Sequence, residues 1–415
     1  MKKHYDIIIV GGGMVGASLA SALIAASNRL QLNIAVIEAF ALPEPGALSY
    51  QPSYDSRATA LAYGSRGIYE AMGIWDTLKE HLCPITDIHV SDKGQFGAAR
   101  LKARDEGVPA LGYVVENHWL GRVLLDRIQQ PDAARIDLIC PAEVLEIHYG
   151  SEQMGLTVQC GDESRSLTAE LVVMADGGRS ELRDRMGIGY RQTCYEQHAV
   201  IANISPEQPH NGVAYERFTD TGPMAFLPLE DDAGSHRMGL VWTVPNAQVD
   251  EVMALSDADF IARLQARFGY RVGRIVKAGS RYSYPLKLSL ADEQVRRGLV
   301  VLGNAAHALH PIAGQGYNLA LRGAVVLADT LISARQDGIN LGELRHLSAF
   351  QQRMRGDQQK TIGFSDQTMK LFSNKHPLLV LGRSAGLQLL DICPLAKTVF
   401  ARSAMGLDIA APRLK

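Results

Sequence analysis

The chain has 415 residues, of which 47% are hydrophobic and 21% are charged, so it is long enough for two or three globular domains. Its formal net charge of −2 argues against nucleic-acid binding, because a phosphate backbone favours a concentrated excess of Lys and Arg. The five cysteines are widely spaced and form no C-x-x-C pair or zinc-like spacing with histidine, which indicates reduced thiols in a cytosolic protein and no metal site.

The first predicted element is a buried strand over residues 5–10, followed by a glycine-rich turn and a helix. Gly11, Gly13 and Gly16 form the pattern G-x-G-x-x-G. In this pattern the first glycine permits a tight turn, the second lets backbone approach a pyrophosphate, and the third lets the helix pack on the strand. The helix directs its unpaired N–H groups at the phosphates. A secretory signal is the alternative interpretation, but an acidic residue before the apolar run and the interrupting glycines disfavour it.

A second predicted strand, residues 33–37, ends at Glu38. At this distance from the glycines a carboxylate accepts hydrogen bonds from an adenosine ribose. The same carboxylate would repel the 2′-phosphate of NADP. The N-terminal region therefore predicts a site for NAD or FAD.

Two later strands favour FAD, which is the longer ligand and needs support from several parts of the chain. The strand over residues 169–175 ends at Asp176 within an Asp-Gly sequence, which by itself is also an ordinary turn signal. The strand over residues 299–302 leads to Asn304, whose amide could hydrogen-bond a polyol hydroxyl. The next helix begins after Gly314-Gln315-Gly316, so its N-terminus can stabilise the negative charge that reduction places near flavin N1.

Short alternating apolar runs between residues 192 and 286 predict an antiparallel sheet. With residues 85–112 this sheet is expected to cover the flavin and to form one wall of an apolar pocket. Three side chains are predicted to line that pocket, with simple core packing as the alternative: Phe226, Pro228 and Trp242.

The chain beyond residue 337 is predicted to be helical, and it contains an apolar tract over residues 378–392 that is too interrupted to span a bilayer. One hypothesis places this tract on a membrane surface with Arg383, Lys397 and Arg402 toward the lipid headgroups. Internal packing or an oligomer contact are the alternatives.

The glycine loop, the Asp-Gly block and the block GNAAHALHPIAGQGYN (303–318) occur in the order found in FAD-dependent aromatic-ring hydroxylases. The chain also contains YDSRATAL (54–61), AYERFTDTGPMAFLPL (214–229) and YPLKL (284–288), and it resembles the ubiquinone-biosynthesis hydroxylases of that family over nearly its whole length. The resemblance implies a para-hydroxybenzoate-hydroxylase-like α/β fold. It combines a Rossmann-type FAD domain with an interleaved antiparallel-sheet substrate domain and a helical C-terminus.

The expected domains follow from this resemblance. The FAD-binding domain is expected to be discontinuous, and the boundaries are 1–84, 113–191 and 287–337 for the FAD domain, 85–112 and 192–286 for the substrate domain, and 338–415 for the C-terminal helical region.

The resemblance also implies roles for individual residues. Gly11, Gly13, Gly16 and Glu38 would serve the ADP half, and Arg57 and Arg122 would lie along the pyrophosphate and flavin. Asp176 would approach the cofactor, and Asn304 occupies a position where most of the wider family has Asp holding the ribitol. The isoalloxazine would be framed by Gly314, Gln315, Gly316 and Asn318.

No side chain is firmly predicted to be catalytic, because the flavin carries the oxygen chemistry in this family. His310 and Pro311 are candidates, Pro311 through a backbone carbonyl near the reacting edge, although a structural role is favoured for His307 and His310.

The activity implied is hydroxylation of a polyprenyl phenol, 2-polyprenyl-6-methoxyphenol, through a C4a-hydroperoxyflavin. FAD would be the cofactor, NADPH or NADH the reductant and O2 the co-substrate. The expected location is the cytoplasm, peripheral on the inner face of the cytoplasmic membrane, with other ubiquinone-biosynthesis proteins as partners. The alternatives are hydroxylation of another ring position, a flavin dehydrogenase or isoprenoid reductase, and a flavin-holding scaffold subunit.

Overall fold

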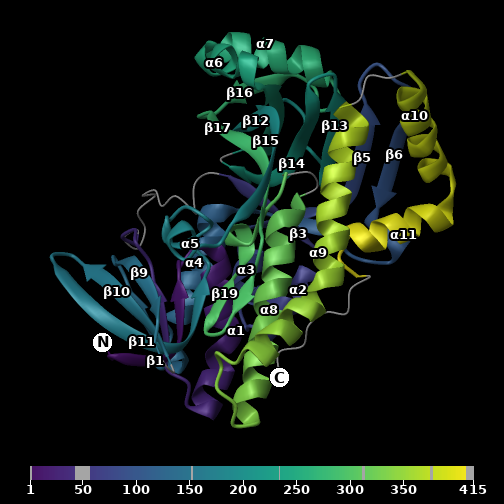
Figure 1. The fold of residues 1–415 in the computed structure, drawn as a ribbon. Helices are drawn as coiled ribbons and strands as arrows, with labels where there is room; N and C mark the ends of the chain where they lie inside the picture. Colours follow the sequence, from purple (N-terminus) through teal and green to yellow (C-terminus); the bar gives the residue numbers. More distant parts are fainter. Residues whose placement is uncertain are drawn as a thin grey trace.

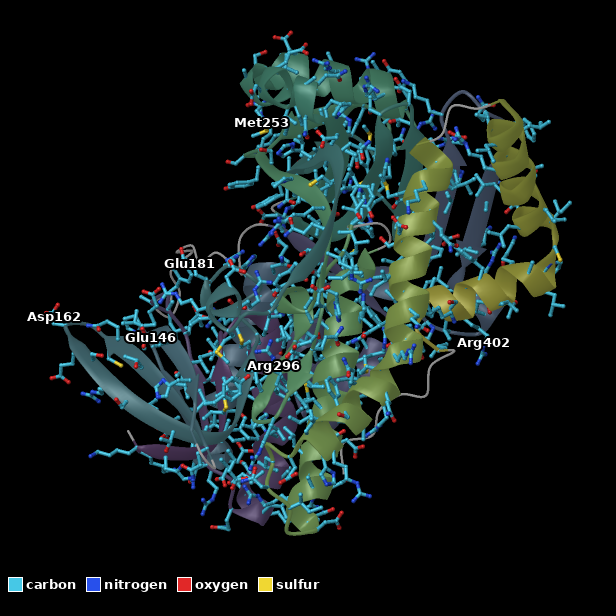
Figure 2. The ribbon with its side chains drawn as sticks, in the orientation of Figure 1. Glu146, Asp162, Glu181, Met253, Arg296 and Arg402 are labelled. Carbon is cyan, nitrogen blue, oxygen red and sulfur yellow. The ribbon has the colours of Figure 1, made fainter. Side chains whose placement is uncertain are left out.

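The computed structural model describes residues 2–42, 57–150, 153–232, 234–310, 314–373 and 377–407. Two large sheets lie side by side, with long helices along one flank and the last two helices beside β5 and β6 (Figure 1). Figure 2 labels Asp162 at the tip of the β10–β11 hairpin and Met253 on α6 in the upper part of the molecule.

The first sheet has eight strands in the described chain, in the order β18-β19-β11-β1-β2-β8, with β10 and β9 continuing from β11. The central strands β19, β11, β1, β2 and β8 are mutually parallel. The strands are β1 (His4–Val10), β2 (Ile34–Ile37), β8 (Ile136–Ile139), β9 (Glu143–Tyr149), β10 (Met154–Cys160), β11 (Glu163–Met174), β18 (Val295–Arg296) and β19 (Leu299–Val301).

Strand β1 is buried on both faces because different elements cover each side of the sheet. Ile7 and Ile9 face a core shared with α1 (Met14–Leu30), α4 (Asn117–Ile128) and α8 (Gln315–Gln336). Ile8 and Val10 alternate with them and face a second core formed with β9, β10 and β11, and Tyr5 at the start of the strand also belongs to this second core. This layering leaves the carboxyl ends of the parallel strands free to hold a ligand.

The second sheet has nine strands in the described chain, in the order β20-β17-β12-β15-β14-β13-β5-β6, with β16 paired to β12. One of its faces packs on α6 (Asn246–Ala254) and α7 (Asp257–Phe268). The strands are β5 (Asp87–Asp92), β6 (Ala98–Lys102), β12 (Tyr190–Pro206), β13 (Val213–Thr219), β14 (Gly222–Asp232), β15 (Ser235–Pro245), β16 (Ile275–Ala278), β17 (Tyr282–Ala291) and β20 (His307–Ala308).

A small third sheet, with the strand order β3-β7-β4, connects the parts of the molecule built on the two large sheets. Its strands and the remaining short helices are β3 (Ala58–Ala62), β4 (Leu82–Ile85), β7 (Gly112–Glu116), α2 (Ser65–Ala71), α3 (Trp75–Leu78), α5 (Leu182–Arg185), η1 (Lys79–His81), η2 (Ala103–Glu106), η3 (Pro131–Ala133) and η4 (Gly303–Ala305).

The C-terminal region is helical, as the sequence predicts, and comprises α9 (Leu344–Ser373), α10 (Pro377–Ile392) and α11 (Pro394–Ala404). The long helix α9 runs up the flank of the molecule, and α10 and α11 form an elbow beside β5 and β6 (Figure 1). Within the described ranges, no individual helix has the length and apolarity needed to cross a membrane. The α10–α11 pair meets that test only jointly, with a bend of 98°.

Candidate functional site

A single continuous cavity of about 960 Å³ lies where the carboxyl ends of the parallel strands meet the second sheet and the C-terminal helices. Its nucleotide end includes ten of the residues predicted to bind the cofactor: Gly11, Gly13, Glu38, Arg57, Asp176, Asn304, Gly314, Gln315, Gly316 and Asn318. Tertiary structure thus brings together segments from both ends of the chain.

The first glycine loop is shaped by close backbone contacts. Gly11 has a φ of 103°, and a Cβ there would lie 2.7 Å from the Ala175 carbonyl oxygen. Gly16 does not line the cavity, but a Cβ at this position would lie 1.9 Å from the Gly11 carbonyl oxygen. Gly16 therefore sets the loop's shape by packing α1 against it, the part assigned to the third glycine of the motif.

Glu38 closes the nucleotide end from the tip of β2. Its side chain is buried, with Oε2 accepting a 2.7 Å hydrogen bond from the Gly12 N–H and Oε1 a 3.0 Å bond from the Phe40 N–H. Each carboxylate oxygen has a further lone pair that can accept a hydrogen bond from a ribose hydroxyl. The backbone thus holds the carboxylate in place before any ligand binds.

Asp176 stabilises its own turn while lining the cavity. Its carboxylate accepts hydrogen bonds from the Gly178 N–H at 3.0 Å, the Ser180 N–H at 3.1 Å and the Ser180 hydroxyl. The Asp-Gly sequence therefore forms an ordinary turn and also lies at the cofactor site, so the two interpretations are compatible.

The N-terminus of α8 opens onto the cavity. Gly314 precedes the helix with a φ of 61°, and a Cβ there would lie 3.0 Å from that of Ala60 on β3. Among the residues that the structure describes, no side chain caps this helix, so its first N–H groups are available to a ligand. Gln315 and Gly316 line the cavity at the same point.

Asn318 has a different role from the one predicted. Its Oδ1 accepts hydrogen bonds of 2.8 Å from the Ala62 N–H and the Ser65 hydroxyl. Its Nδ2 donates to the carbonyls of Ala60 at 2.8 Å and Gly314 at 2.9 Å. Because all four amide positions are used within the protein, Asn318 fastens β3 and α2 to the start of α8 and does not itself offer a hydrogen bond to the flavin.

Arg57 and Asn304 lie on the cavity wall, with the Arg57 guanidinium 4.8 Å from the centre of the Tyr284 ring. Arg122 does not lie there: its side chain is exposed and sits 3.6 Å from Asp126 on the same helix. The prediction for Arg122 is wrong because the cavity-facing residue of α4 is Asn117. Arg122 lies five residues further along the helix, where the side chain points in a direction rotated by roughly 140° about the helix axis.

Sequence reasoning missed Asn117 and Arg179, both of which line the cavity. Asn117 is buried, and its Oδ1 accepts a 2.6 Å hydrogen bond from the Thr59 hydroxyl. Its signal in the sequence is a polar residue at the helix start directly after the buried strand β7. Arg179 stands within the Asp-Gly block itself, three residues after Asp176.

His310 lies on the cavity wall between the two ends, packed edge-on against Tyr195 at 5.4 Å. Burial lowers the pKa of His310 to about 4, and neither ring nitrogen has a hydrogen-bond partner among the described residues. Burial also lowers the pKa of His307. Both rings are therefore neutral at pH 7. Pro311, the other catalytic candidate, lies outside the described residues.

The predicted substrate-binding residues Phe226, Pro228 and Trp242 do not line the cavity. Phe226 stacks on Phe268 of α7 at 3.7 Å, and Trp242 lies in the same core. The prediction chose the wrong face of the sheet, because side chains alternate along a strand.

The cavity-facing positions of the same strands are small or aliphatic: Ala225, Leu227, Gly239 and Val241. The opposite wall comes from the C-terminal helices, through Phe364, Thr368 and Phe372 of α9, Leu387 and Leu390 of α10, and Phe400 of α11. This end of the cavity is therefore a pocket with predominantly apolar walls.

Two of the three cations predicted to face lipid instead make contacts within the protein. The Arg383 guanidinium lies 2.7 Å from the buried Asp92 carboxylate, which fixes α10 to β5. Lys397 lies 3.4 Å from Asp391. Arg402 is exposed on α11 at the outer side of the molecule (Figure 2).

These features fit FAD. A side chain at Gly11 or Gly16 would clash with neighbouring backbone, so the glycine loop keeps a bare backbone that a ligand can approach closely. The Glu38 carboxylate is oriented for a ribose, and the N-terminus of α8 opens where the apolar pocket begins. FAD would be held by the β1–α1 loop, the Asp176 turn, Asn304 and the segment 314–316.

Comparison with known proteins supports this arrangement. The profile of the FAD binding domain family matches residues 4–339. The ubiquinone hydroxylase UbiL of Rhodospirillum rubrum is 35% identical, over 97% of this chain and 90% of that protein. The 3-demethoxyubiquinol 3-hydroxylase of Escherichia coli is 31% identical, over 97% of this chain and 98% of that protein.

The fold is shared with solved structures. The p-nitrophenol 4-monooxygenase PnpA of Pseudomonas putida superposes with a TM-score of 0.78 at 16% identity, covering 99% of this chain and all (100%) of that one. The predicted fold, FAD as the cofactor and the monooxygenase class are confirmed. The chain belongs to the FAD-dependent monooxygenase family that includes the ubiquinone-biosynthesis hydroxylases.

Proposed function

We propose that the protein hydroxylates the aromatic ring of a polyprenyl phenol, 2-polyprenyl-6-methoxyphenol, in ubiquinone biosynthesis. The observation that carries the proposal is the continuity of the cavity from Glu38 at the nucleotide end to the apolar pocket at the other. A ring in that pocket would lie beside the α8 N-terminus, where the cofactor residues end. The names of the Rhodospirillum and Escherichia relatives support the pathway.

The protein's contribution is positional. FAD, when bound, supplies the redox and oxygen chemistry together with NAD(P)H and O2. The apolar walls formed by β13, β14, α9 and α10 exclude water and hold the ring close to the cofactor end. The open N-terminus of α8 stabilises negative charge at the junction between the two ends.

The ring position attacked has a second candidate. The Escherichia relative is named for the hydroxylation of 3-demethoxyubiquinol, and it is nearly as similar to this chain as the Rhodospirillum protein. We therefore place the 6-methoxyphenol first, on the resemblance of the sequence motifs, and the demethoxyubiquinol second.

The test is direct. The FAD-loaded protein is reduced without oxygen, mixed with a short-tailed 2-prenyl-6-methoxyphenol, and then exposed to O2, with short-tailed 3-demethoxyubiquinol in a parallel reaction. We expect a hydroxylated ring from the first substrate. Hydroxylation of the second alone would assign the other ring position, and hydrogen peroxide without any hydroxylated ring would reject the proposed function.

We also infer that the α10–α11 elbow docks on the inner face of the cytoplasmic membrane, where a lipid-tailed substrate resides. The outer side of the elbow exposes Leu389 by 61%, Ile392 by 71%, Leu395 by 77% and Val399 by 64%, while its inner side lines the cavity through Leu387 and Phe400. Sedimentation with anionic phospholipid vesicles tests this inference. The triple change L389S/I392S/L395S should abolish binding, and Leu344→Ser, an exposed leucine on α9, should not. Equal binding of both variants would contradict it.

A further inference from the structure

The cavity-facing side of the second sheet carries one acidic residue among apolar ones. Glu216 on β13 is paired across the sheet with Val90 on β5 and with Ala225 on β14. The row continues through Val241 on β15 to Ile201 on β12, and all five residues line the cavity. Glu216 is thus the second residue of a five-residue row whose other members are aliphatic.

Its surroundings along the strand are equally apolar. Ala214 and Phe218, two residues to either side, also line the cavity, as do Ile88 and Leu227 on the neighbouring strands. Within the described chain, Glu216 is the only acidic residue that the strands of this sheet contribute to the cavity lining. The other charged lining residues come from the nucleotide end and from the helices.

Glu216 has no bonded partner in the part of the chain that the structure describes. Its carboxylate takes part in no hydrogen bond or ion pair there, and burial alone raises its pKa to about 7. Glu216 is partly buried and faces the cavity among apolar side chains, where a charged form is disfavoured, so a ligand with a hydrogen-bond donor would supply the contact that the carboxylate lacks. The group it lacks is a hydrogen-bond donor located in the apolar pocket.

We propose that Glu216 accepts a hydrogen bond from the phenol hydroxyl of the ring substrate and so fixes the ring's orientation in the pocket; this inference rests on the proposed function. A phenol O–H would supply the donor that Glu216 lacks, and the remaining faces of a prenylated ring match the aliphatic side chains around Glu216. The ionised carboxylate also draws the phenol proton toward itself, which makes the ring more electron-rich. Glu216 is therefore a positioning and polarising residue for the substrate.

The experiment compares two ligands that differ by one donor. The phenol is a short-tailed 2-prenyl-6-methoxyphenol, and its methyl ether has the same shape but no O–H. Dissociation constants are measured by calorimetry with oxidised, FAD-loaded protein and no reductant, between pH 6 and pH 8. Wild type should prefer the phenol by about 10–100-fold at pH 8. The preference should shrink toward pH 6, as Glu216 takes up its proton.

Two variants separate the charge from the hydrogen bond. Glu216→Leu should bind both ligands equally at every pH, and Glu216→Gln should keep a small preference that does not change with pH. Glu230→Gln, on the adjacent strand β14 but outside the main cavity, should behave as wild type. Retention of FAD and an unchanged circular dichroism spectrum show that each variant is folded.

Several outcomes would overturn the role of Glu216. A Leu variant that still discriminates as wild type does would overturn it, as would a wild-type preference that grows toward low pH, because Glu216 would then be a donor. In both cases wild type still binds the phenol, and the proposed function stands. If folded, FAD-loaded wild type bound neither ligand, the proposed function would fail and this inference with it.

Discussion

Replacing Asn318 by Leu tests whether this residue is a structural clamp and not a flavin ligand. The side chain is 1% exposed and makes four hydrogen bonds of 2.8–2.9 Å. Its removal leaves the donors of Ala62 and Ser65 and the carbonyls of Ala60 and Gly314 without their partner. Each buried unsatisfied group costs about 1–3 kcal/mol, and partial relaxation reduces the sum, so we expect a loss of about 3–5 kcal/mol.

The assay is urea unfolding of the FAD-free protein, followed by circular dichroism. Asn318→Asp is a second, near-isosteric variant, because it keeps the shape and both acceptor contacts but loses the two donors to Ala60 and Gly314. It should destabilise as well, since a carboxylate then faces two carbonyls. FAD affinity should fall in both variants, because Gly314 loses its tether at the start of α8.

The opposite result would refute the clamp. If Asn318→Leu unfolded at the wild-type urea concentration and lost only FAD affinity, the side chain would be a ligand contact, as the sequence suggested. A variant that kept both stability and FAD affinity would show that the four hydrogen bonds contribute nothing measurable.

Three further predictions follow from the packing and charges. Gly16→Ala should abolish FAD binding, measured by flavin fluorescence quenching, because its Cβ would lie 1.9 Å from the Gly11 carbonyl oxygen; unchanged affinity would contradict this role of Gly16. Glu216→Gln should stabilise the FAD-free protein by roughly 2–3 kcal/mol at pH 8 and not at pH 4. The sign follows because a raised carboxyl pKa makes wild type lose stability as pH rises from 4.5 to about 7; equal urea midpoints at both pH values would disprove it. Arg383→Met should cost about 3–5 kcal/mol by leaving Asp92 buried and unpaired, and adding Asp92→Asn should restore part of the loss; a cost below about 1 kcal/mol would show that the pair is not buried in solution.

The sequence was informative wherever local backbone chemistry dictates the structure. The strand, glycine loop, helix and Glu38 of the nucleotide site are close in sequence, and the contact that requires Gly16, with the Gly11 carbonyl oxygen, lies within the same motif. The order of the glycine loop, the Asp-Gly block and the 303–318 block was sufficient to predict the fold and the cofactor.

Tertiary structure decided which side chains of those segments face the cavity. Phe226 and Trp242 looked like pocket residues because they are large and apolar, yet the strand alternation directs them to the core under α7. Arg122 and Asn117 lie on one helix, and only the docking of α4 determines which of them faces the ligand.

The sequence by itself predicted a dinucleotide-binding loop and a long, flavin-like ligand, because backbone geometry and spacing are local properties. Only the folded chain determined that Asn318 is fully used within the protein and that Glu216 lies alone in an aliphatic row. The reason is physical: a hydrogen-bond partner, or its absence, depends on residues far away in the sequence, and no local pattern records which of them arrive.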